Sequence, residues 1–145
     1  MNVKRGIKRG IRQDAIRGIV RKESVRTQEE LTERLVGLGF DCTQATVSRD
    51  MAEIGLRKLA NGTYVLAGDD HLQHVVSEFM LACSANGSFV VVTTRAGASS
   101  LMAGAIDAAG LPSAVCTFTG NDAVLVACDG DVGAAEVVDM LERLR

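Results

Sequence analysis

The stretch GFDCTQATVSRDMAEIGL, residues 39–56, contains a segment whose apolar residues recur at helical spacing. These residues form a single stripe: Val47, Met51 and Ile54. Thr43 can cap the start of such a helix with its side-chain oxygen, and Gly55 can end it. The remaining side chains are polar and mostly face away from the stripe. The stretch therefore predicts a helix over residues 43–55 whose outer face meets something outside the chain.

A second helix is predicted just before this one, in RTQEELTERLVGLGF at residues 26–40. Thr27 and Glu30 have the spacing of a capping box, and Gly39 stands where a glycine commonly ends a helix. The apolar residues of this helix are predicted to face inward: Leu31, Leu35 and Leu38. Because only a few residues separate the two helices, we expect them to form a helix-turn-helix.

Two further elements complete a small domain. Residues 11–22, IRQDAIRGIVRK, predict an earlier amphipathic helix with one apolar stripe: Ile11, Ala15, Ile16, Ile19 and Val20. Residues 57–66, RKLANGTYVL, predict two short strands joined at Asn61-Gly62, the dipeptide favoured in a type I′ hairpin turn. Three helices followed by a hairpin are typical of a winged helix, which we place over residues 1–67.

The charge changes sign along the chain. Residues 1–66 carry 13 Lys or Arg against 8 Asp or Glu, and residues 67–145 carry 3 against 10, so the two parts have formal charges of +5 and −7. A basic part on an acidic chain favours a module that binds a polyanion, because cationic side chains displace condensed counterions from phosphates. The alternative is that the charges only solvate one face. We place a domain boundary at AGDD, residues 67–70, where the sign changes.

Residues 68–145 predict a second domain of mixed helices and strands. Apolar spacing predicts a first helix from Leu72 to a stop at Asn86-Gly87, and SFVVVTTR, residues 88–95, predicts a strand buried on both faces. The remaining elements are a helix in residues 96–110 with Leu101, Ala105 and Ile106 facing inward, strands at 114–118 and 123–128, and a helix over 131–145. The α-β-α-β-β-α order describes a small α/β sandwich. The predicted fold class is therefore α+β, a winged helix-turn-helix domain followed by this sandwich.

A helix-turn-helix places its last helix in the major groove of DNA, which gives each polar residue of that helix a possible partner. Gln44 can hydrogen-bond an adenine or a phosphate, Thr46 can contact a thymine methyl, and Arg49 can donate two hydrogen bonds to guanine. Ser48 is better suited to a phosphate oxygen. We therefore predict that this helix recognises double-stranded DNA.

A structural interpretation of the same residues competes with this one. Gln44 can be an ordinary polar first-turn residue, and Arg49 can pair with Asp50 or Glu53 on its own helix. The coincidence of capped helices, a short turn, an Asn-Gly hairpin and basic charge in one segment favours DNA binding. Basic residues at the edges of the segment are predicted to contact the DNA backbone without selecting sequence: Arg26, Arg57 and Lys58.

Other functional classes lack the residues they need. The cysteines show no CxxC pair, so we interpret them as reduced, small hydrophobic residues and predict no metal: Cys42, Cys83, Cys116 and Cys128. An enzyme needs a nucleophile with a nearby base or a ligand cluster, and we predict no catalytic residue because none is apparent. No apolar run approaches the ~18 residues of a membrane span. Residues 1–13 also lack the apolar segment of a signal peptide, so we expect a cytoplasmic protein without a membrane partner.

The segment RTQEELTERLVGLGFDCTQATVSRDMAEIGLRKL, residues 26–59, resembles the N-terminal domain of the bacterial arginine repressor family. The likeness is strongest in RTQEEL and in TQATVSRD followed by EIGL, and it continues more weakly to the end of the chain. The resemblance places Ser48 and Arg49 in the recognition helix. It implies operator DNA as a partner and a C-terminal domain that forms a hexamer as a dimer of trimers. L-arginine, bound at the trimer interface, is the implied corepressor, with no other cofactor.

Two stretches carry the resemblance in the second domain: AGASSLMAGAIDAAGLP, residues 96–112, and CTFTGNDAVLV, residues 116–126. The first resembles a family helix with a polar ligand contact and an acidic residue. The second resembles a family turn in which a glycine precedes two aspartates. The resemblance implies these ligand-binding residues: Ser100, Asp107, Thr117, Asn121 and Asp122.

Asn121 departs from the family pattern, which has the first of the two aspartates at this position. A guanidinium is best held by a carboxylate in a two-bond fork, and an amide replaces one carboxylate here. Losing a charged partner from a buried pair typically costs about 3 to 5 kcal/mol. The chain also lacks the family's proline at Ala96, its glutamine at Ser100 and its glycine at Cys116. Without the resemblance, Gly120 and Asn121 are interpreted as residues that a hairpin turn tolerates.

Our main hypothesis is a transcription repressor of arginine metabolism genes with L-arginine as corepressor. Arginine can still bind through Asp107 and Asp122, the pocket can prefer another small ligand, or the chain can repress without an effector. The alternatives are therefore a repressor that responds to another ligand and an effector-independent architectural DNA-binding protein. An enzyme is not predicted.

Overall fold

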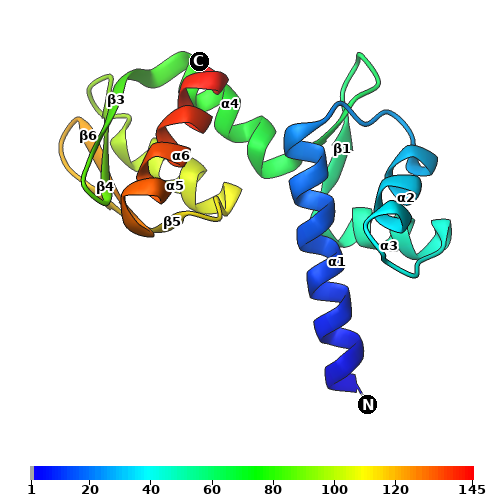
Figure 1. Cartoon of the computed structure of the whole chain (residues 1–145). Coiled ribbons are helices and arrows are strands. Elements are labelled where there is room, and N and C mark those ends of the chain that lie inside the picture. The colour runs from blue at the N-terminus through cyan, green and yellow to red at the C-terminus, as the bar shows by residue number, and fades with distance from the viewer. Residues whose placement is uncertain (1) are drawn as a thin grey trace. The chain divides into compact units, whose positions relative to one another are not determined.

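In the computed structural model the chain folds into two compact units that divide between Ala67 and Gly68 (Figure 1). The structure describes residues 2–145, and all side chains in that range except those of Asn2 and Arg5. Each unit encloses its own hydrophobic core, as an independently folded body does.

The first unit contains three helices and a two-stranded hairpin. Its elements are α1 (Asn2–Lys22), α2 (Gln28–Gly37), α3 (Gln44–Ile54), β1 (Leu56–Lys58) and β2 (Tyr64–Leu66). The helices bury one stripe each, and Val25 joins them from the segment between α1 and α2. The core residues of the unit are Ile16, Val20, Val25, Leu31, Leu35, Val47 and Met51. This arrangement confirms the predicted winged helix-turn-helix, with α3 as its last helix and the hairpin as its wing.

Side-chain caps define where α2 and α3 begin. Thr27 Oγ1 accepts the backbone N–H of Glu30 at 3.1 Å, as predicted. The Glu30 carboxylate reaches back to the backbone N–H of Arg26 at 3.2 Å, one residue earlier than in a standard capping box. Thr43 caps α3 in the same way, and Gly55 ends it in a left-handed conformation with φ 75°. The short turn between the helices therefore has a fixed geometry.

The wing differs from the predicted type I′ turn. Leu59 N–H donates to Thr63 O at 2.8 Å and Gly62 N–H donates to Leu59 O at 2.9 Å, so the loop holds three residues. Gly62 has φ 89°, but Asn61 does not have positive φ. A type I′ turn needs positive φ at both positions, whereas a three-residue loop needs it only at the final glycine. The Asn61 side chain instead accepts the backbone N–H of Thr63 at 2.9 Å.

Three predictions about the helices of this unit are wrong in detail. The first helix begins at Asn2 instead of residue 11. Ile11 and Leu38, predicted to face inward, are 56% and 64% exposed. The apolar spacing in α1 continues through Val3 and Ile7, but no other element of the unit covers this end of the helix, and both residues are exposed. Leu38 follows the last residue of α2, so the helical spacing no longer directs its side chain toward the core.

The second unit is a four-stranded antiparallel sheet packed against helices. Its elements are α4 (Ala67–Phe79), β3 (Met80–Asn86), β4 (Phe89–Thr94), α5 (Ser99–Ala109), β5 (Ala114–Thr119), β6 (Ala123–Cys128) and α6 (Gly130–Leu144). The strand order is β3-β4-β6-β5. Helices α5 and α6 pack on the sheet, and the core between them contains Val90, Val92, Met102, Ile106, Val124, Val126, Val137 and Leu141. The α/β class is confirmed.

The order of elements in this unit is not the predicted one. The helix predicted from Leu72 to Asn86 ends at Phe79, and residues 80–86 form β3 instead. Met80 and Cys83 fit a helical stripe, but in the structure β3 pairs along its length with β4. Two residues, Gly87 and Ser88, connect the strands, and Gly87 has φ 61°. The observed order is therefore α-β-β-α-β-β-α.

One face of the sheet is open in the single chain, which corrects the prediction that residues 88–95 are buried on both faces. Val90, Val92 and Thr94 are buried beneath the helices, while the residues between them point away. Cross-strand pairing aligns the outward residues in two rows. The first row contains Val91, Leu125 and Phe118, and the second contains Phe89, Ala127 and Cys116. We call these six residues the open sheet face.

Helix α5 also departs in one respect from its predicted face. Ala105 and Ile106 are buried as expected, but Leu101 is 44% exposed, and Met102 takes the buried position beside it. Gly68, in the first turn of α4, lies so close to the end of α5 that an added Cβ would be 2.9 Å from the Ala108 carbonyl oxygen. A side chain at this position would require α4 and α5 to separate.

Candidate DNA interface and effector site

The outer face of α3 carries the polar residues that the sequence assigned to DNA. Gln44 and Arg49 are exposed, and Thr46 and Ser48 are half-buried. The Thr46 hydroxyl lies 3.0 Å from that of Thr43, so part of its hydrogen-bonding capacity is used at the helix cap. Because the opposite stripe of α3 is buried in the core, this polar face points away from the core.

Arg49 is not paired with either of the carboxylates that could neutralise it on its own helix. Asp50 is 2% exposed and binds Arg12 of α1, while Glu53 accepts a hydrogen bond from Gln13 at 2.7 Å. Among the described residues, the Arg49 side chain has no hydrogen bond or ion pair. The structural interpretation of Arg49 is therefore wrong, and its guanidinium is free for an external acceptor.

The contact between Arg12 and Asp50 joins α1 to α3. Arg12 uses two of its nitrogens: Nε donates to one carboxylate oxygen and Nη2 donates to the other at 3.1 Å. Gln13 adds a hydrogen bond to Asp50 at 3.2 Å. The hydrogen bond to Asp50 raises the pKa of the Arg12 guanidinium, and desolvation opposes that shift. No local sequence pattern predicts this contact, because the two residues are far apart along the chain.

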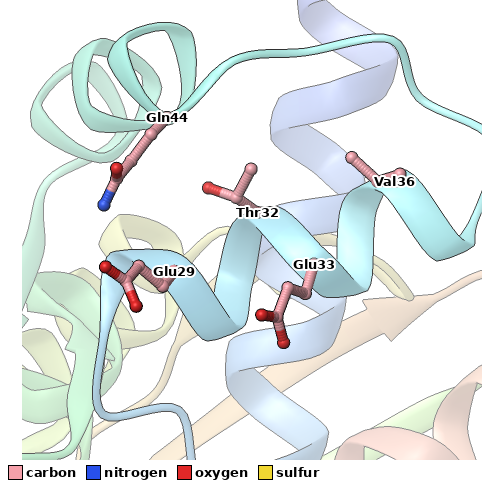
Figure 2. Close-up of a pocket in the computed structure, with 5 residues that line it drawn as sticks. All are labelled: Glu29, Thr32, Glu33, Val36 and Gln44. Carbon is pink, nitrogen blue, oxygen red and sulfur yellow. The ribbon is translucent and has the colours of Figure 1, made fainter.

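A hollow of about 370 Å³ lies between α2 and the first turn of α3. Figure 2 shows Gln44 extending toward Glu29 at one end of this hollow, with the other lining residues along α2. The lining consists of Glu29, Thr32, Glu33, Val36 and Gln44. Two carboxylates repel a phosphate. Of the two partners predicted for Gln44, this neighbourhood favours a base edge over a phosphate.

The remaining DNA-binding candidates lie on the wing and before α2. Arg57 and Lys58 belong to β1 and are exposed. The Lys58 ammonium lies 5.2 Å from the centroid of the Tyr64 ring on the paired strand, within the range of a cation–π contact. Arg26 is exposed just before the cap of α2. All three side chains are exposed, and they remain candidates for contacts with the DNA backbone.

In the second unit, α5 and β5 bring two of the predicted ligand residues together. Thr117 Oγ1 lies 3.0 and 3.1 Å from the two oxygens of the Asp107 carboxylate. A hydroxyl donates only one proton, so the carboxylate retains free lone pairs. Ser100 precedes Asp107 by seven residues and is exposed on the same side of α5. This side of α5 can therefore offer an anionic acceptor and a hydroxyl to one ligand.

The turn between β5 and β6 carries Asn121 and Asp122, whose side chains are both exposed. Residues of α5 and β4 hydrogen-bond the backbone of this turn. Ser99 Oγ donates to Gly120 O at 2.8 Å, and Thr94 N–H donates to Asp122 O at 2.9 Å. Ser99 and Thr94 are buried. They support the turn but were not identified from the sequence, where the only signal was a serine at the start of a predicted helix.

The conformation of the turn does not explain why residue 121 is asparagine. Among the described residues only glycines have positive φ, so Asn121 is not in the left-handed region that asparagine tolerates. The turn and Asp107 remain separate groups, since no hydrogen bond or ion pair within residues 2–145 joins Asp107 to Asn121 or Asp122. The structure thus brings together Asp107 and Thr117, but not the full predicted set.

The cysteines and acidic residues add no further site. Burial raises the pKa of the Cys83 thiol to about 11, with a hydrogen bond to Glu142 adding to the shift. Cys42, beside α3, is half-buried, and desolvation also raises its pKa. In the described part of the chain, no three His, Cys, Asp or Glu side chains cluster in a way that could hold a metal ion. Across residues 2–145, no helix is both long and apolar enough to span a bilayer.

Three helices, a hairpin wing and an outward recognition face define a winged helix-turn-helix DNA-binding protein. Residues 7–71 match the family model described as "Arginine repressor, DNA binding domain", and residues 76–143 match "Arginine repressor, C-terminal domain". The chain belongs to the arginine repressor family.

Similar proteins span nearly the whole chain. An arginine repressor from Caldicellulosiruptor bescii is 37% identical over 143 residues, covering 92% of this chain and 94% of that protein. An arginine repressor from Thermus thermophilus is 38% identical over 139 residues, covering 88% of this chain and 85% of that protein. The chain is accordingly a DNA-binding transcription regulator, and it is not an enzyme.

Proposed function

We propose that the protein represses genes of arginine metabolism by binding operator DNA in the cytoplasm, with L-arginine as its corepressor. Residues 1–67 form the DNA-binding domain, and residues 68–145 form the domain for self-association and effector binding. The observation that carries the proposal is the free, outward Arg49 on α3, in a chain whose two units both match the family.

In this proposal the residues of α3 divide into those that select sequence and those that contact phosphates. Arg49 donates to guanine and Gln44 to a base edge, while Thr46 contacts a thymine methyl. Ser48 binds a phosphate. Three peripheral cations add attraction that does not depend on sequence: Arg26, Arg57 and Lys58.

The effector half of the proposal follows from the chemistry of arginine. Its guanidinium needs a carboxylate, and Asp107 and Asp122 are the anionic groups among the five candidates. Ser100, Thr117 and Asn121 can hydrogen-bond the α-amino and α-carboxylate groups or the remaining guanidinium protons. Because Asp107 and the turn are not joined in the single chain, the ligand is expected to bridge groups that assembly brings together.

The open sheet face supports self-association. It places two phenylalanines, a leucine and a valine side by side on solvent, and contiguous apolar surface of this kind typically marks an interface. We propose that copies of the chain cover this face in trimers and that two trimers pair into a hexamer. Several winged helices on one particle can then bind paired operator half-sites, which raises affinity through effective concentration.

Binding of arginine at the interface between copies would couple the two functions. If arginine favours the assembly that binds operator more tightly, then operator DNA must favour arginine binding by the same factor. A second candidate function is effector-independent architectural DNA binding. It is favoured by Asn121, which removes one carboxylate from the turn.

Calorimetry with L-arginine, L-citrulline and L-lysine separates these functions. Citrulline keeps the shape of arginine but lacks its charge, so we expect saturable heat with arginine and much weaker heat with citrulline. The same titration with Asp122→Asn should lose the arginine signal if this carboxylate holds the guanidinium. No heat from the wild-type protein at millimolar arginine, together with unchanged operator binding, would favour the architectural function.

Fluorescence anisotropy on an operator selected from a random DNA library tests the DNA-binding roles. Arg49→Ala should cost about 1–3 kcal/mol on the selected operator and relax specificity at one position. Lys58→Ala should weaken binding to all sequences and reduce the salt slope by about one. Equal losses on operator and on scrambled DNA for Arg49→Ala would contradict the assignment.

A further inference from the structure

A buried ion pair lies directly behind the recognition face and has no part in the functions described so far. The Asp50 side chain is 2% exposed and that of Arg12 is 15% exposed. Arg12 contacts both carboxylate oxygens of Asp50, and Gln13 contacts one of them. Gln13 also donates to Glu53 one turn further along α3. Two consecutive residues of α1 thus hold two successive turns of α3.

The ion pair is poorly explained as a source of stability. Burying two charges loses their hydration, and replacing such a pair by well-packed apolar residues is often neutral or stabilising. The neighbouring α3 residues Val47 and Met51 already pack into the core, so a third apolar residue would fit the same stripe. A charged pair at this position therefore calls for a reason other than stability.

The geometry of the pair supplies that reason. Apolar packing is non-directional, so Val47 and Met51 alone resist a small rotation of α3 only weakly. A guanidinium that binds both oxygens of a carboxylate has a narrow set of geometries. Asp50 also follows Arg49 directly in the chain, so fixing the direction of one side chain on the helix fixes that of the other.

We propose that Arg12, Gln13 and Asp50 set the rotation of α3 about its axis and thereby position Arg49 for sequence-specific DNA contact. Asp50 is then a positioning residue for operator specificity, acting through Arg49 without touching DNA. The inference rests on the proposed role of Arg49. It predicts that the pair controls the ratio of operator to non-specific affinity more than it controls folding.

Two variants separate geometry from charge and from stability. Arg12→Lys keeps the positive charge but cannot form the two-bond fork. The double variant Arg12→Met with Asp50→Leu removes both charges together and leaves no unpaired ion in the core. Glu23 and Arg34 form an exposed ion pair elsewhere in the same unit, so Arg34→Gln is the matched control.

Each variant is assayed as the full chain by anisotropy on the selected operator and on scrambled DNA, and by thermal unfolding. We expect the ratio of operator affinity to scrambled-DNA affinity to fall in both test variants. The largest fall should be about 5- to 150-fold, because that is the range that one bidentate base contact supplies. The affinity of both test variants for scrambled DNA should be unchanged. The melting temperature of the double variant should be unchanged or higher than that of the wild type. Arg34→Gln should match the wild type.

A wild-type specificity ratio in both test variants would overturn the proposal, whether the two affinities are unchanged or fall equally on operator and on scrambled DNA. Failure of the underlying assignment has a different signature. If Arg49→Ala itself leaves the ratio unchanged, Arg49 does not read sequence, and the positioning role has no target.

Discussion

Phe118 offers the sharpest test of how the second unit meets other copies of the chain. Phe118 is 57% exposed on the open sheet face, and Phe89 is 44% exposed. A fully covered phenylalanine buries about 200 Å², so these fractions leave ~110 and ~90 Å² of residue surface for a partner. At about 25 cal/mol per Å², complete coverage would contribute ~3 and ~2 kcal/mol.

We expect Phe118→Ala to weaken association by up to about 3 kcal/mol at each contact, or roughly a hundredfold in the association constant. Sedimentation velocity over a concentration series would show the assembly dissociating at protein concentrations where the wild type stays intact. The far-ultraviolet circular dichroism of the variant should be unchanged, because the ring lies outside the core of its own chain.

Val132 provides the matched control, since it is 74% exposed on α6 and does not belong to the open sheet face. Val132→Ala should assemble like the wild type. A wild-type sedimentation profile for Phe118→Ala and for the double variant with Phe89→Ala would refute the idea that this face joins the copies. A loss of helical signal would instead mean that the rings support the fold.

Three other expectations can be tested directly. Thr43→Ala removes the cap of α3 and should lower the free energy of unfolding of the first unit by about 1 kcal/mol, measured by urea denaturation. Asn121→Asp should strengthen arginine binding in calorimetry by adding a carboxylate to the turn, and an unchanged affinity would place residue 121 outside the site. In timed alkylation at pH 8, Cys116 on the open sheet face should react only after the assembly dissociates. Cys83 should react slowly in either state because its pKa is raised to about 11.

The first unit could be predicted well because its signals are local. The caps at Thr27 and Thr43 and the glycine at the end of α3 are each formed within a few residues. The contact between Arg12 and Asp50 spans 38 residues, and no local pattern in the sequence identifies it. The exposure of a side chain at the end of a helix could not be predicted either, because it depends on which other elements pack there. Leu38, just after α2, is an example.

The second unit was harder because its central ambiguity is not local. Residues 80–86 permit either a helix or an edge strand, and the choice depends on β4, which lies later in the chain. The likeness to a family identified Asp107 and Thr117 as candidates, and the structure brings them together. It could not show that Asn121 and Asp122, on the turn between β5 and β6, make no hydrogen bond or ion pair with Asp107 within the described residues.

The wing gives the protein a spectroscopic signature of its own. The chain has one tyrosine and no tryptophan, so its intrinsic tyrosine fluorescence comes from Tyr64 alone. A lysine ammonium lies over this ring, and a DNA phosphate that drew Lys58 away would change the electric field at the fluorophore. Emission from unlabelled protein therefore reports on one hairpin, which allows engagement of the wing to be timed separately from engagement of α3.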